Sequence, residues 1–281
     1  MSNVEIYYFS GTGNSLHVAK ELQKRIPDTN LIPIVSLLNK DVIETGGETV
    51  GFVFPVYVTM IPVPVKDFLK RLDLTSTTYI FAIATRAGSP HRAFIDIEKI
   101  LKKRGRSLDS YFTLNMGANY LSPNPTEEEI AELASVVQAK LDSIQQIIMN
   151  KEKNREKDTQ STVPLPFASV FFRFVPLFAA FADYAGLKPF FYADSKCTGC
   201  GICERVCLSQ KITMTDRKPI WQEDVRCYMC YACINYCPAQ SVQLRSAWYM
   251  HGLDTPKLGR YSHPYATVED IAGEKERKAE I

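Results

Sequence analysis

The first half of the chain alternates between two hydrophobic patterns. Short apolar runs rich in β-branched and aromatic residues predict strands, and apolar residues at helical spacing between these runs predict helices. The predicted strands cover residues 4–9, 31–35, 49–54, 78–84 and 110–115. The predicted helices cover residues 16–26, 63–72, 91–103 and 126–150. Five apolar strands that alternate with helices predict an α/β fold with a doubly wound parallel sheet.

A polar loop joins the first predicted strand to the first predicted helix. Its residues are Ser10, Gly11, Thr12, Gly13, Asn14 and Ser15. Backbone N–H groups at a helix N-terminus, glycines that allow close approach and hydroxyl donors together indicate an anion site. The dinucleotide pattern G-x-G-x-x-G fails because Leu16 occupies its last position, and no P-loop lysine follows. The loop therefore predicts a phosphate held by neutral donors, with an ordinary strand-to-helix turn as the alternative.

This loop resembles the flavodoxin phosphate fingerprint, T/S-x-T-G-x-T/S, at Ser10, Thr12, Gly13 and Ser15. The resemblance implies FMN as the cofactor, the flavodoxin-like sheet order 2-1-3-4-5 and a ligand beyond the carboxyl ends of the strands. In flavodoxins, the loops after the third and fourth strands enclose the isoalloxazine ring. By position, the implied contacts are Pro55, Val56, Tyr57, Val58, Thr85, Arg86, Ala87 and Gly88, with Asn119 and Tyr120 from the next loop.

Several of these implied contacts have a simpler alternative. Arg86 fits either charge neutralisation beside a reduced flavin or a solvated loop position. Tyr57 and Tyr120 fit either stacking on the ring or ordinary packing. His17 is expected to be a surface residue.

The middle of the chain, residues 151–192, differs in composition from its surroundings. Residues 151–158 form a mixed charge run, which predicts a solvated linker. The next segment is rich in phenylalanine, and Arg173 and Asp183 leave only residues 174–182 uninterrupted. That run is shorter than the roughly 20 apolar residues of a membrane span. We expect a bridge of short helices that packs between two domains, with peripheral membrane contact as the alternative.

All eight cysteines lie between residues 197 and 237, in two copies of the run C-x-x-C-x-x-C-x-x-x-C. They are Cys197, Cys200, Cys203 and Cys207, then Cys227, Cys230, Cys233 and Cys237. Structural zinc needs only four ligands, usually as two C-x-x-C pairs, and disulfides between such near neighbours would be strained. The duplicated run is that of bacterial proteins with two [4Fe-4S] clusters. We therefore favour iron–sulfur clusters over zinc or disulfides.

Residues 196–244 thus resemble the bacterial-type two-cluster ferredoxins, which implies a small C-terminal α+β domain. The resemblance also implies that the fourth cysteine of each run crosses to the other cluster. One cluster would take Cys197, Cys200, Cys203 and Cys237, and the other Cys227, Cys230, Cys233 and Cys207. Pro238 follows Cys237 as in the family, whereas Leu208 follows Cys207. Ligation is expected to survive that departure. Residues 241–245 predict a short closing strand, and residues 269–281 predict a loose charged tail.

Composition sets further limits. The 281 residues are 46% hydrophobic and 23% charged, which is typical of a globular protein. A net charge of +2 gives no indication of nucleic acid as a partner. The first residues lack the features of a signal peptide, and cysteines that must stay reduced favour the cytoplasm of an organism in an oxygen-poor habitat. The predicted domains are residues 1–150 (flavodoxin-like), 151–192 (linker and bridge), 193–245 (ferredoxin) and 246–281 (extension and tail).

The combination resembles the fused flavodoxin–ferredoxin proteins of anaerobic bacteria, which implies low-potential electron transfer. A flavin exchanges one or two electrons and a [4Fe-4S] cluster exchanges one, so the pair predicts a redox carrier that couples one- and two-electron steps. No catalytic side chain is predicted, because no nucleophile set is recognisable. The alternatives are a flavin-dependent reductase of a quinone, nitro compound or unsaturated metabolite, and a redox sensor. The expected partner is a redox protein, either a ferredoxin or a reductase, or a small acceptor; the sequence does not set the oligomeric state.

Overall fold

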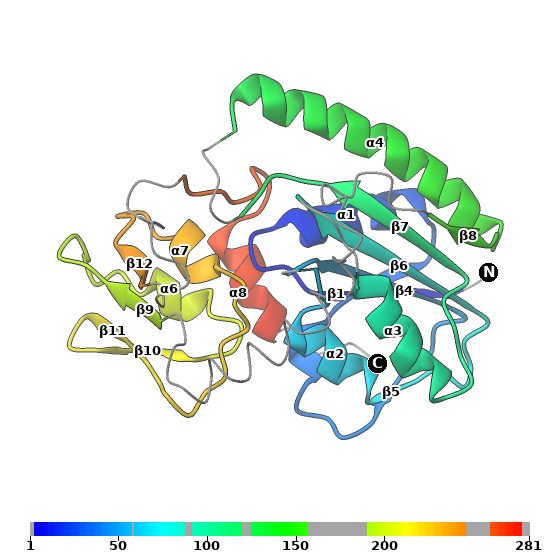
Figure 1. Cartoon of the computed structure of the whole chain (residues 1–281), viewed down its shortest axis with the longest axis horizontal. Coiled ribbons are helices and arrows are strands. Elements are labelled where there is room, and N and C mark those ends of the chain that lie inside the picture. Colours follow the sequence, from blue (N-terminus) through cyan, green and yellow to red (C-terminus); the bar gives the residue numbers. More distant parts are fainter. Residues whose placement is uncertain are drawn as a thin grey trace, which may run out of the picture.

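The computed structural model describes residues 3–57, 59–87, 92–119, 125–156, 190–245 and 259–276. Its largest unit is a six-stranded parallel sheet in the order β2-β1-β4-β6-β7-β8, with helices on both faces (Figure 1). The strands are β1 (Val4–Tyr8), β2 (Thr29–Pro33), β4 (Thr49–Pro55), β6 (Tyr79–Arg86), β7 (Ser110–Asn115) and β8 (Asn154–Arg155). The predicted order 2-1-3-4-5 is confirmed, and the two-residue β8 extends the sheet beside β7.

Burial explains why the apolar runs form the central strands. Every residue of β6 is buried, and so is every residue of β4 except the last, because helices cover both faces of the sheet. The helices α1 (Asn14–Arg25) and α4 (Glu127–Met149) pack together on one face, and α2 (Val63–Leu69) and α3 (Ala93–Lys102) on the other (Figure 1). Apolar spacing therefore predicted the four helices, although their ends shift by up to three residues.

The second strand differs from its prediction. β2 begins and ends two residues before the predicted range, because its register pairs Thr29 with Val4. A 3₁₀ helix, η1 (Ile34–Leu37), follows at once and takes the apolar residues that had predicted the end of the strand. Two further strands, β3 (Ile43–Glu44) and β5 (Leu72–Asp73), pair with each other and are too short for a hydrophobic pattern to predict.

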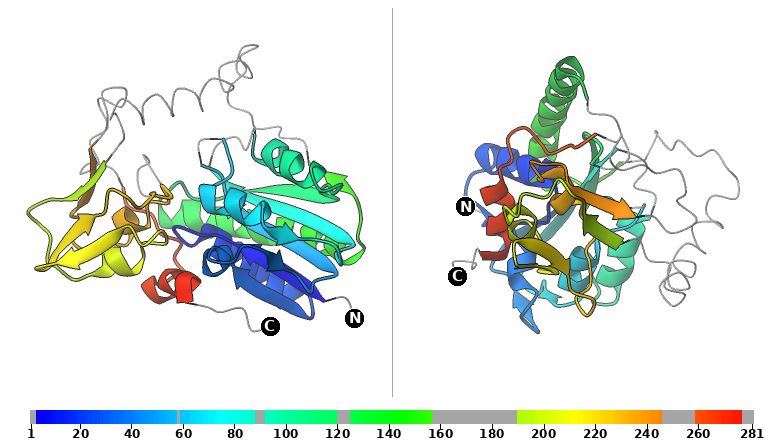
Figure 2. Two further views of the ribbon diagram at one scale, coloured as in Figure 1. Left: turned by 90° about the horizontal axis from the view of Figure 1, so that it is seen from below. Right: turned by 90° about the vertical axis from the view of Figure 1, so that its left-hand side faces the viewer.

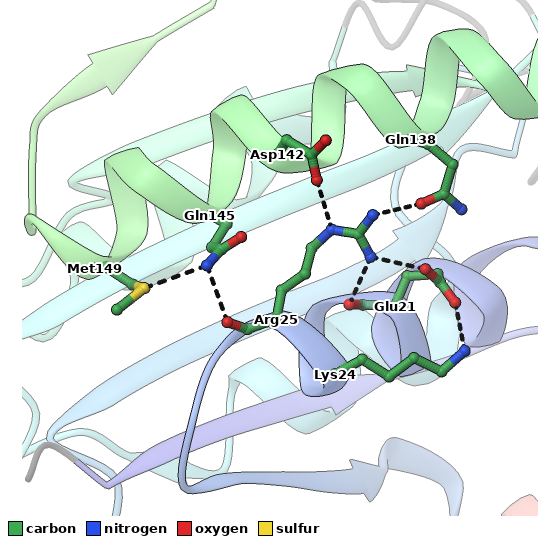
Figure 3. A network of polar contacts seen from close by, with 7 residues as sticks. All are labelled: Glu21, Lys24, Arg25, Gln138, Asp142, Gln145 and Met149. Carbon is green, nitrogen blue, oxygen red and sulfur yellow. Dashed lines mark hydrogen bonds and ion pairs between the residues drawn. The ribbon is translucent and has the colours of Figure 1, made fainter.

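A polar network fixes α4 on α1 (Figure 3). The Arg25 guanidinium lies between the helices and donates to Asp142 at 2.9 Å and to Glu21 at 2.7 Å. It also contacts Gln138, and Gln145 donates to the Arg25 carbonyl at 3.0 Å. This network holds α1, whose N-terminus follows the predicted anion loop.

We call residues 3–156 the first part of the molecule and residues 190–245 the second part. The second part is small and lies at one end (Figure 2). β9 (Phe190–Ala193) pairs with β12 (Val242–Arg245), and β10 (Ile212–Thr215) pairs with β11 (Lys218–Trp221), both antiparallel. The one-turn helices α6 (Ile202–Arg205) and α7 (Ala232–Asn235) occupy equivalent places in the two cysteine runs. The predicted strand at residues 241–245 is present as β12.

The last described segment corrects the prediction of a loose charged tail for residues 269–276, and residues 277–281 lie outside the described residues. Residues 268–276 form the helix α8 (Val268–Glu276), in which Ile271 and Glu274 are fully buried. α8 packs on η1 in the first part and on α6 in the second, so it lies between the two (Figures 1 and 2). The tail was predicted wrongly because a helix with so few apolar residues gives no amphipathic pattern.

The two parts share buried residues. Val206, Leu208 and Ala232 belong to the same hydrophobic cluster as the residues of the sheet. The predicted Phe-rich bridge falls mainly at residues 157–189, which lie outside the described residues. Within the described ranges, no helix has both the length and the apolar character that a membrane crossing requires.

Candidate cofactor sites

The anion loop, residues 10–15, connects β1 to α1. Gly13 precedes the helix in a left-handed conformation with φ of +95°, which other residues rarely adopt. Ser10, Thr12 and Ser15 are buried. Ser10 Oγ accepts a hydrogen bond from Gly13 N at 3.1 Å, and Ser15 Oγ shares one of 2.8 Å with Thr85 Oγ1. These bonds close the loop and tie it to β6.

The donor chemistry of this loop fits a phosphate monoester. The loop offers the N-terminal N–H groups of α1 and three hydroxyl side chains as donors, and it holds no lysine or arginine. A carboxyl group of the chain already lies beside it, because Ser10 N donates to Glu274 Oε2 at 3.2 Å. Glu274 is fully buried, so the loop supplies a hydrogen-bond donor to an acceptor oxygen away from bulk water. The phosphate oxygens of FMN need donors of this kind.

The predicted ring contacts lie at adjacent strand ends and in a third loop. Val56 N donates to the Thr85 carbonyl at 3.0 Å, which holds the loop after β4 beside β6. Arg86 is only 7% exposed, so the alternative of a solvated Arg86 is wrong. The Asn119 carbonyl accepts a hydrogen bond of 2.9 Å from Asn235 in the second part of the molecule. Pro55 ends β4 opposite Thr85, and Ala87 is exposed after β6. The predicted residues Val58, Gly88 and Tyr120 lie outside the described ranges.

Tyr57 lies where the loop after β4 meets the cysteine-containing part. Its ring packs edge-on against Phe9, with centroids 6.3 Å apart, and Phe9 packs in the same way against Tyr228 at 6.2 Å. Burial, followed by the neighbouring Cys230 and Glu274, raises the pKa of Tyr57 well above its ordinary value. Tyr57 therefore keeps its proton and presents a neutral hydroxyl between the two parts.

Four cysteines from both runs, which we call the outer set, line one small cavity. They are Cys197, Cys200, Cys203 and Cys237. Burial, followed by the neighbouring Cys237, Cys200 and Cys197, raises the pKa of Cys203 to about 11. Burial also acts on Cys237, but hydrogen bonds from Ser241 and the backbone outweigh it and lower the pKa of Cys237. Ser241 donates from its backbone N–H at 3.3 Å, a bond that favours the thiolate form needed for ligation.

The other four cysteines, which we call the inner set, are also electrostatic neighbours. They are Cys207, Cys227, Cys230 and Cys233. Burial and then Cys207 raise the pKa of Cys227, and burial raises that of Cys230 far above its usual range. Cys207 Sγ accepts from Lys211 N at 3.3 Å, and Cys227 Sγ accepts from Met229 N at 3.4 Å. The cavity of the outer set brings Cys237 of the second run together with three cysteines of the first run, and the crossed ligation that the ferredoxin resemblance implies stays a prediction. Among the described residues, no group of three or more His, Cys, Asp or Glu side chains is arranged to hold a single metal ion.

The two cysteine runs share their backbone turns. Gly199 and Gly201 have left-handed φ angles of +71° and +77°, and Met229 and Tyr231 at the equivalent positions have +53° and +58°. Gln210 N and Gln240 N each donate at 3.0 Å to the carbonyl of the fourth cysteine of their run.

Leu208 therefore leaves the turn unchanged where the ferredoxin pattern has proline. Its side chain is only 1% exposed and packs into the main core. The substitution exchanges a turn residue for contact with the first part of the molecule.

The inner set and the anion loop share a wall. A Cβ atom on Gly11 would lie 2.5 Å from the Cys230 carbonyl oxygen, 2.7 Å from Cys230 Cβ and 2.9 Å from the Tyr57 hydroxyl. Only glycine fits this contact, because real Cβ atoms essentially never come this close to another atom. The missing side chain at Gly11 therefore lets the cysteine loop lie directly on the anion loop.

Residues 259–276, the C-terminal arm, cover the other side of the anion loop. His263 N donates to the Thr12 carbonyl at 2.8 Å, and a Cβ on Gly13 would lie 2.2 Å from Ala266 Cβ. The arm is joined to both parts, since Lys20 pairs with Asp270 at 2.7 Å and Lys275 donates to the Arg205 carbonyl at 2.6 Å. The sequence prediction missed these contacts.

The sequence does carry a signal for the start of α8. It is the helix-start pattern Thr267-x-x-Asp270, whose side chains and backbone N–H groups bond reciprocally.

Two histidines meet beside the arm. The rings of His17 and His263 stack with centroids 4.1 Å apart, and His17, which was expected at the surface, is half-buried. Burial, followed by the neighbouring His17, lowers the pKa of His263 to about 3. Burial also lowers the pKa of His17, although Glu21 opposes that shift. Both rings are therefore neutral at neutral pH.

A larger cavity, of about 1120 Å³, lies beyond this histidine pair. It is lined by the first half of α4, by residues 115–118 after β7 and by the arm around Tyr265. Its lining is mainly apolar, as in pockets for small organic ligands.

Comparisons with known proteins gave one family match and several similar structures. Residues 196–242 match the family described as 4Fe-4S dicluster domain. Among solved structures, the chain is similar to an FMN-dependent NADH-azoreductase from Bacillus anthracis in complex with FMN, with 10% identity over 51% of this chain and 98% of that chain, at a TM-score of 0.36. It is also similar to a flavodoxin, WrbA-like protein from Agrobacterium tumefaciens, with 13% identity over 54% of this chain and all of that chain, at a TM-score of 0.34. A comparison with curated proteins found no match.

The chain thus joins a flavodoxin-like α/β sheet to a segment of the 4Fe-4S dicluster type. Iron–sulfur segments of this kind carry electrons, so the general role is redox chemistry or electron transfer.

Proposed function

We propose that the protein transfers electrons between two [4Fe-4S] clusters and an FMN within one chain, and so couples one- and two-electron steps. The observation that carries this proposal is the shared wall, in which Cys230 lies directly against Gly11 of the anion loop. A flavin supplies the ability to exchange either one or two electrons. The residues of the chain bind, enclose and position the redox groups.

The anion loop would hold the FMN phosphate, through the hydroxyls of Ser10, Thr12 and Ser15 and the N-terminal N–H groups of α1. Arg86, buried at the end of β6, would offset negative charge on the reduced ring. The outer and inner cysteine sets would each hold one cluster, with the inner set next to the flavin. The N–H bonds to Cys207, Cys227 and Cys237 would tune the two clusters, because such bonds stabilise charge on sulfur.

The domain division 1–150, 151–192, 193–245 and 246–281 is part of this proposal, with one change in the role of the last segment. The arm near the C-terminus contacts the anion loop, so we assign it to the flavin site. Location in the cytoplasm follows from the need of eight cysteines for a reducing compartment.

A flavin-dependent reductase of a small acceptor is the second candidate function. The cavity beside residues 115–118 favours it, because a carrier does not need a small-molecule pocket. Steady turnover of a quinone or nitro compound without a protein partner would support this candidate.

Anaerobic purification followed by iron, sulfide and flavin analysis tests the cofactor content. About eight irons and one FMN per chain are expected from two clusters of this type. Stopped-flow reduction with the methyl viologen radical then compares the full chain with an iron-depleted form. The relay predicts that flavin is reduced faster when the clusters are present. Equal rates in the two forms would show that the clusters do not supply the flavin.

The phosphate site has a separate test. Thr12→Val keeps the shape of the side chain and removes one donor, so FMN binding should weaken by about 1.5–3 kcal/mol, as for a hydrogen bond to a charged group. Quenching of flavin fluorescence measures this affinity, and Thr75→Val at an exposed position is the control. Unchanged affinity in Thr12→Val would place the phosphate elsewhere.

A further inference from the structure

The two cysteine sets differ in their access from solvent. The inner set is covered on one side by the anion loop, through the contact between Cys230 and Gly11. In the outer set Cys200 is exposed. The cavity of the outer set is also lined by Met214 and Pro219 of β10 and β11, at the end of the molecule away from the sheet (Figures 1 and 2). Cys200 is thus the one exposed cysteine of the eight, and a second protein can reach the outer set there.

The surface around the outer set is basic. Lys196 directly precedes the first cysteine, and Arg217 and Lys218 lie at the turn of the β10–β11 hairpin; all three residues are exposed. Arg217 Nη2 donates to the Thr198 carbonyl at 3.2 Å, which holds this turn beside the first cysteine loop. Asp216 is an exposed acid of the same turn. Asp194, which is half-buried, accepts from Lys196 N at 2.9 Å. Among the described residues of this rim, three exposed cations thus outnumber one exposed and one half-buried carboxylate.

We propose that this basic rim, Lys196, Arg217 and Lys218 around Cys200, is the docking surface for an acidic one-electron redox protein. The inference rests on the intramolecular electron transfer proposed above, which we call the relay. It adds the surface at which electrons enter and the class of the partner. In the exchange, the reduced partner loses one electron and the outer site gains it. No bond forms or breaks, and no proton moves. Complementary charge speeds the encounter of two such proteins, and the effect weakens as salt screens the charges.

A charge reversal tests the rim. The variant Lys196→Glu/Lys218→Glu changes two exposed side chains, while Arg217 stays because it supports the cysteine loop. The probe is a small, acidic bacterial two-cluster ferredoxin, reduced beforehand and mixed anaerobically with the full chain. At low ionic strength, bleaching of the clusters should slow by on the order of 10-fold or more, and the salt dependence of the rate should flatten or reverse. The control, Lys102→Glu/Lys103→Glu at the end of α3, has the same net charge and should react like the native protein.

A second measurement does not depend on electron transfer. A carbodiimide joins carboxylates of a docked partner to lysine amines without a spacer, and mass spectrometry locates the bonds. Crosslinks of the ferredoxin probe to Lys196 or Lys218 are expected, and salt should suppress them. Reduction by the methyl viologen radical, a small cation, should be no slower in the reversed variant, which verifies that its clusters are loaded.

The outcomes distinguish failure of the proposed docking surface from failure of the relay. A native rate in Lys196→Glu/Lys218→Glu, equal slowing in both variants, or crosslinks that map mainly to residues 3–156 would each overturn the docking surface. If only the relay is wrong, the probe bleaches the clusters with the expected charge dependence while the flavin stays oxidised. The neutral variant Lys196→Gln/Lys218→Gln serves if reversal disturbs folding, and it should show a smaller slowing in the same direction.

Discussion

At the scale of single residues, the missing side chain at Gly11 sets how closely the two parts approach. Its backbone lies outside the left-handed region, so the loop itself accepts alanine, and the three atoms nearest to a Cβ belong to Cys230 and Tyr57. Gly11→Ala should push the inner cysteine loop away at a cost of about 1–3 kcal/mol, as in other overpacked contacts. Hydrogen exchange of residues 227–233 should rise and electron transfer to the flavin should slow, while the iron and FMN contents stay unchanged.

Gly273→Ala is the matched control for this change, because its Cβ would meet nothing within 4 Å. Within α8, alanine should instead stabilise the helix by roughly 0.5–1 kcal/mol. If Gly11→Ala left exchange in residues 227–233 as slow as in the native chain, the contact would not limit the approach of the two parts.

The stacked histidines make docking of the arm depend on pH. The pKa of His263 is about 3 in the docked arm and ordinarily 6.5, so only the undocked arm gains a proton between these values. The contribution of His263 is therefore complete above about pH 6.5 and decreases as the pH falls towards 3. The loss is about 2 kcal/mol at pH 5, and the lowered pKa of His17 acts in the same direction.

Hydrogen exchange of α8 between pH 8 and 5, corrected for the intrinsic effect of pH, measures this loss. Protection should fall with pH in the native protein. In His263→Phe, which keeps a stacking ring without a titrating group, the decrease should be smaller. The same pH dependence in both proteins would assign it to another group that titrates in this range, such as His17, whose pKa is also lowered from 6.5.

At the scale of elements, α8 joins the two parts although it is short. Its Ile271 side chain is fully buried. Asp270 pairs with Lys20 of the first part, and Glu269 pairs with Arg205 of the second. Ile271→Ala should destabilise docking of the arm by about 2–5 kcal/mol, as for other buried aliphatic truncations. Because the arm covers the anion loop, FMN should then dissociate faster, which the recovery of flavin fluorescence would record. Ile95→Ala, at a residue that is 47% exposed, should leave the release rate unchanged. Slow, native-like release from Ile271→Ala would mean that the arm does not retain FMN.

The elements that the sequence predicted well are those with a local signal. Five apolar runs predicted five strands of the sheet, and the resemblance of the anion loop to flavodoxins supplied their order. The spacing of eight cysteines predicted the segment that matches the 4Fe-4S dicluster family. Apart from the helix-start pattern at Thr267, α8 and the shared wall have no such signal, because the burial of Ile271 and the close contact at Gly11 depend on surfaces distant in sequence. The helix-start pattern at Thr267 and the buried Leu208 in place of proline become informative only once those surfaces are known.

At the scale of the whole molecule, the core runs from the sheet into the cysteine-containing part through Val206, Leu208 and Ala232. The two parts nevertheless differ in what stabilises them. The sheet has a large apolar core, whereas the described residues of the second part form two strand pairs, two one-turn helices and a cluster of six buried residues. So small a core needs the free energy of bound clusters to stay folded.

Removal of iron with a chelator should therefore unfold the second part and leave the sheet folded. Hydrogen exchange should become fast in residues 190–245 and stay slow in β4 and β6. FMN release should also accelerate, because the Cys230 side of its wall loosens. The decisive comparison uses Gly11→Ala, in which that wall is already displaced: chelation should accelerate FMN release much less in this variant than in the native chain, since perturbations of one contact are not additive. Equal acceleration in the two proteins would mean that the clusters act on the flavin site by a route other than the contact between Cys230 and Gly11.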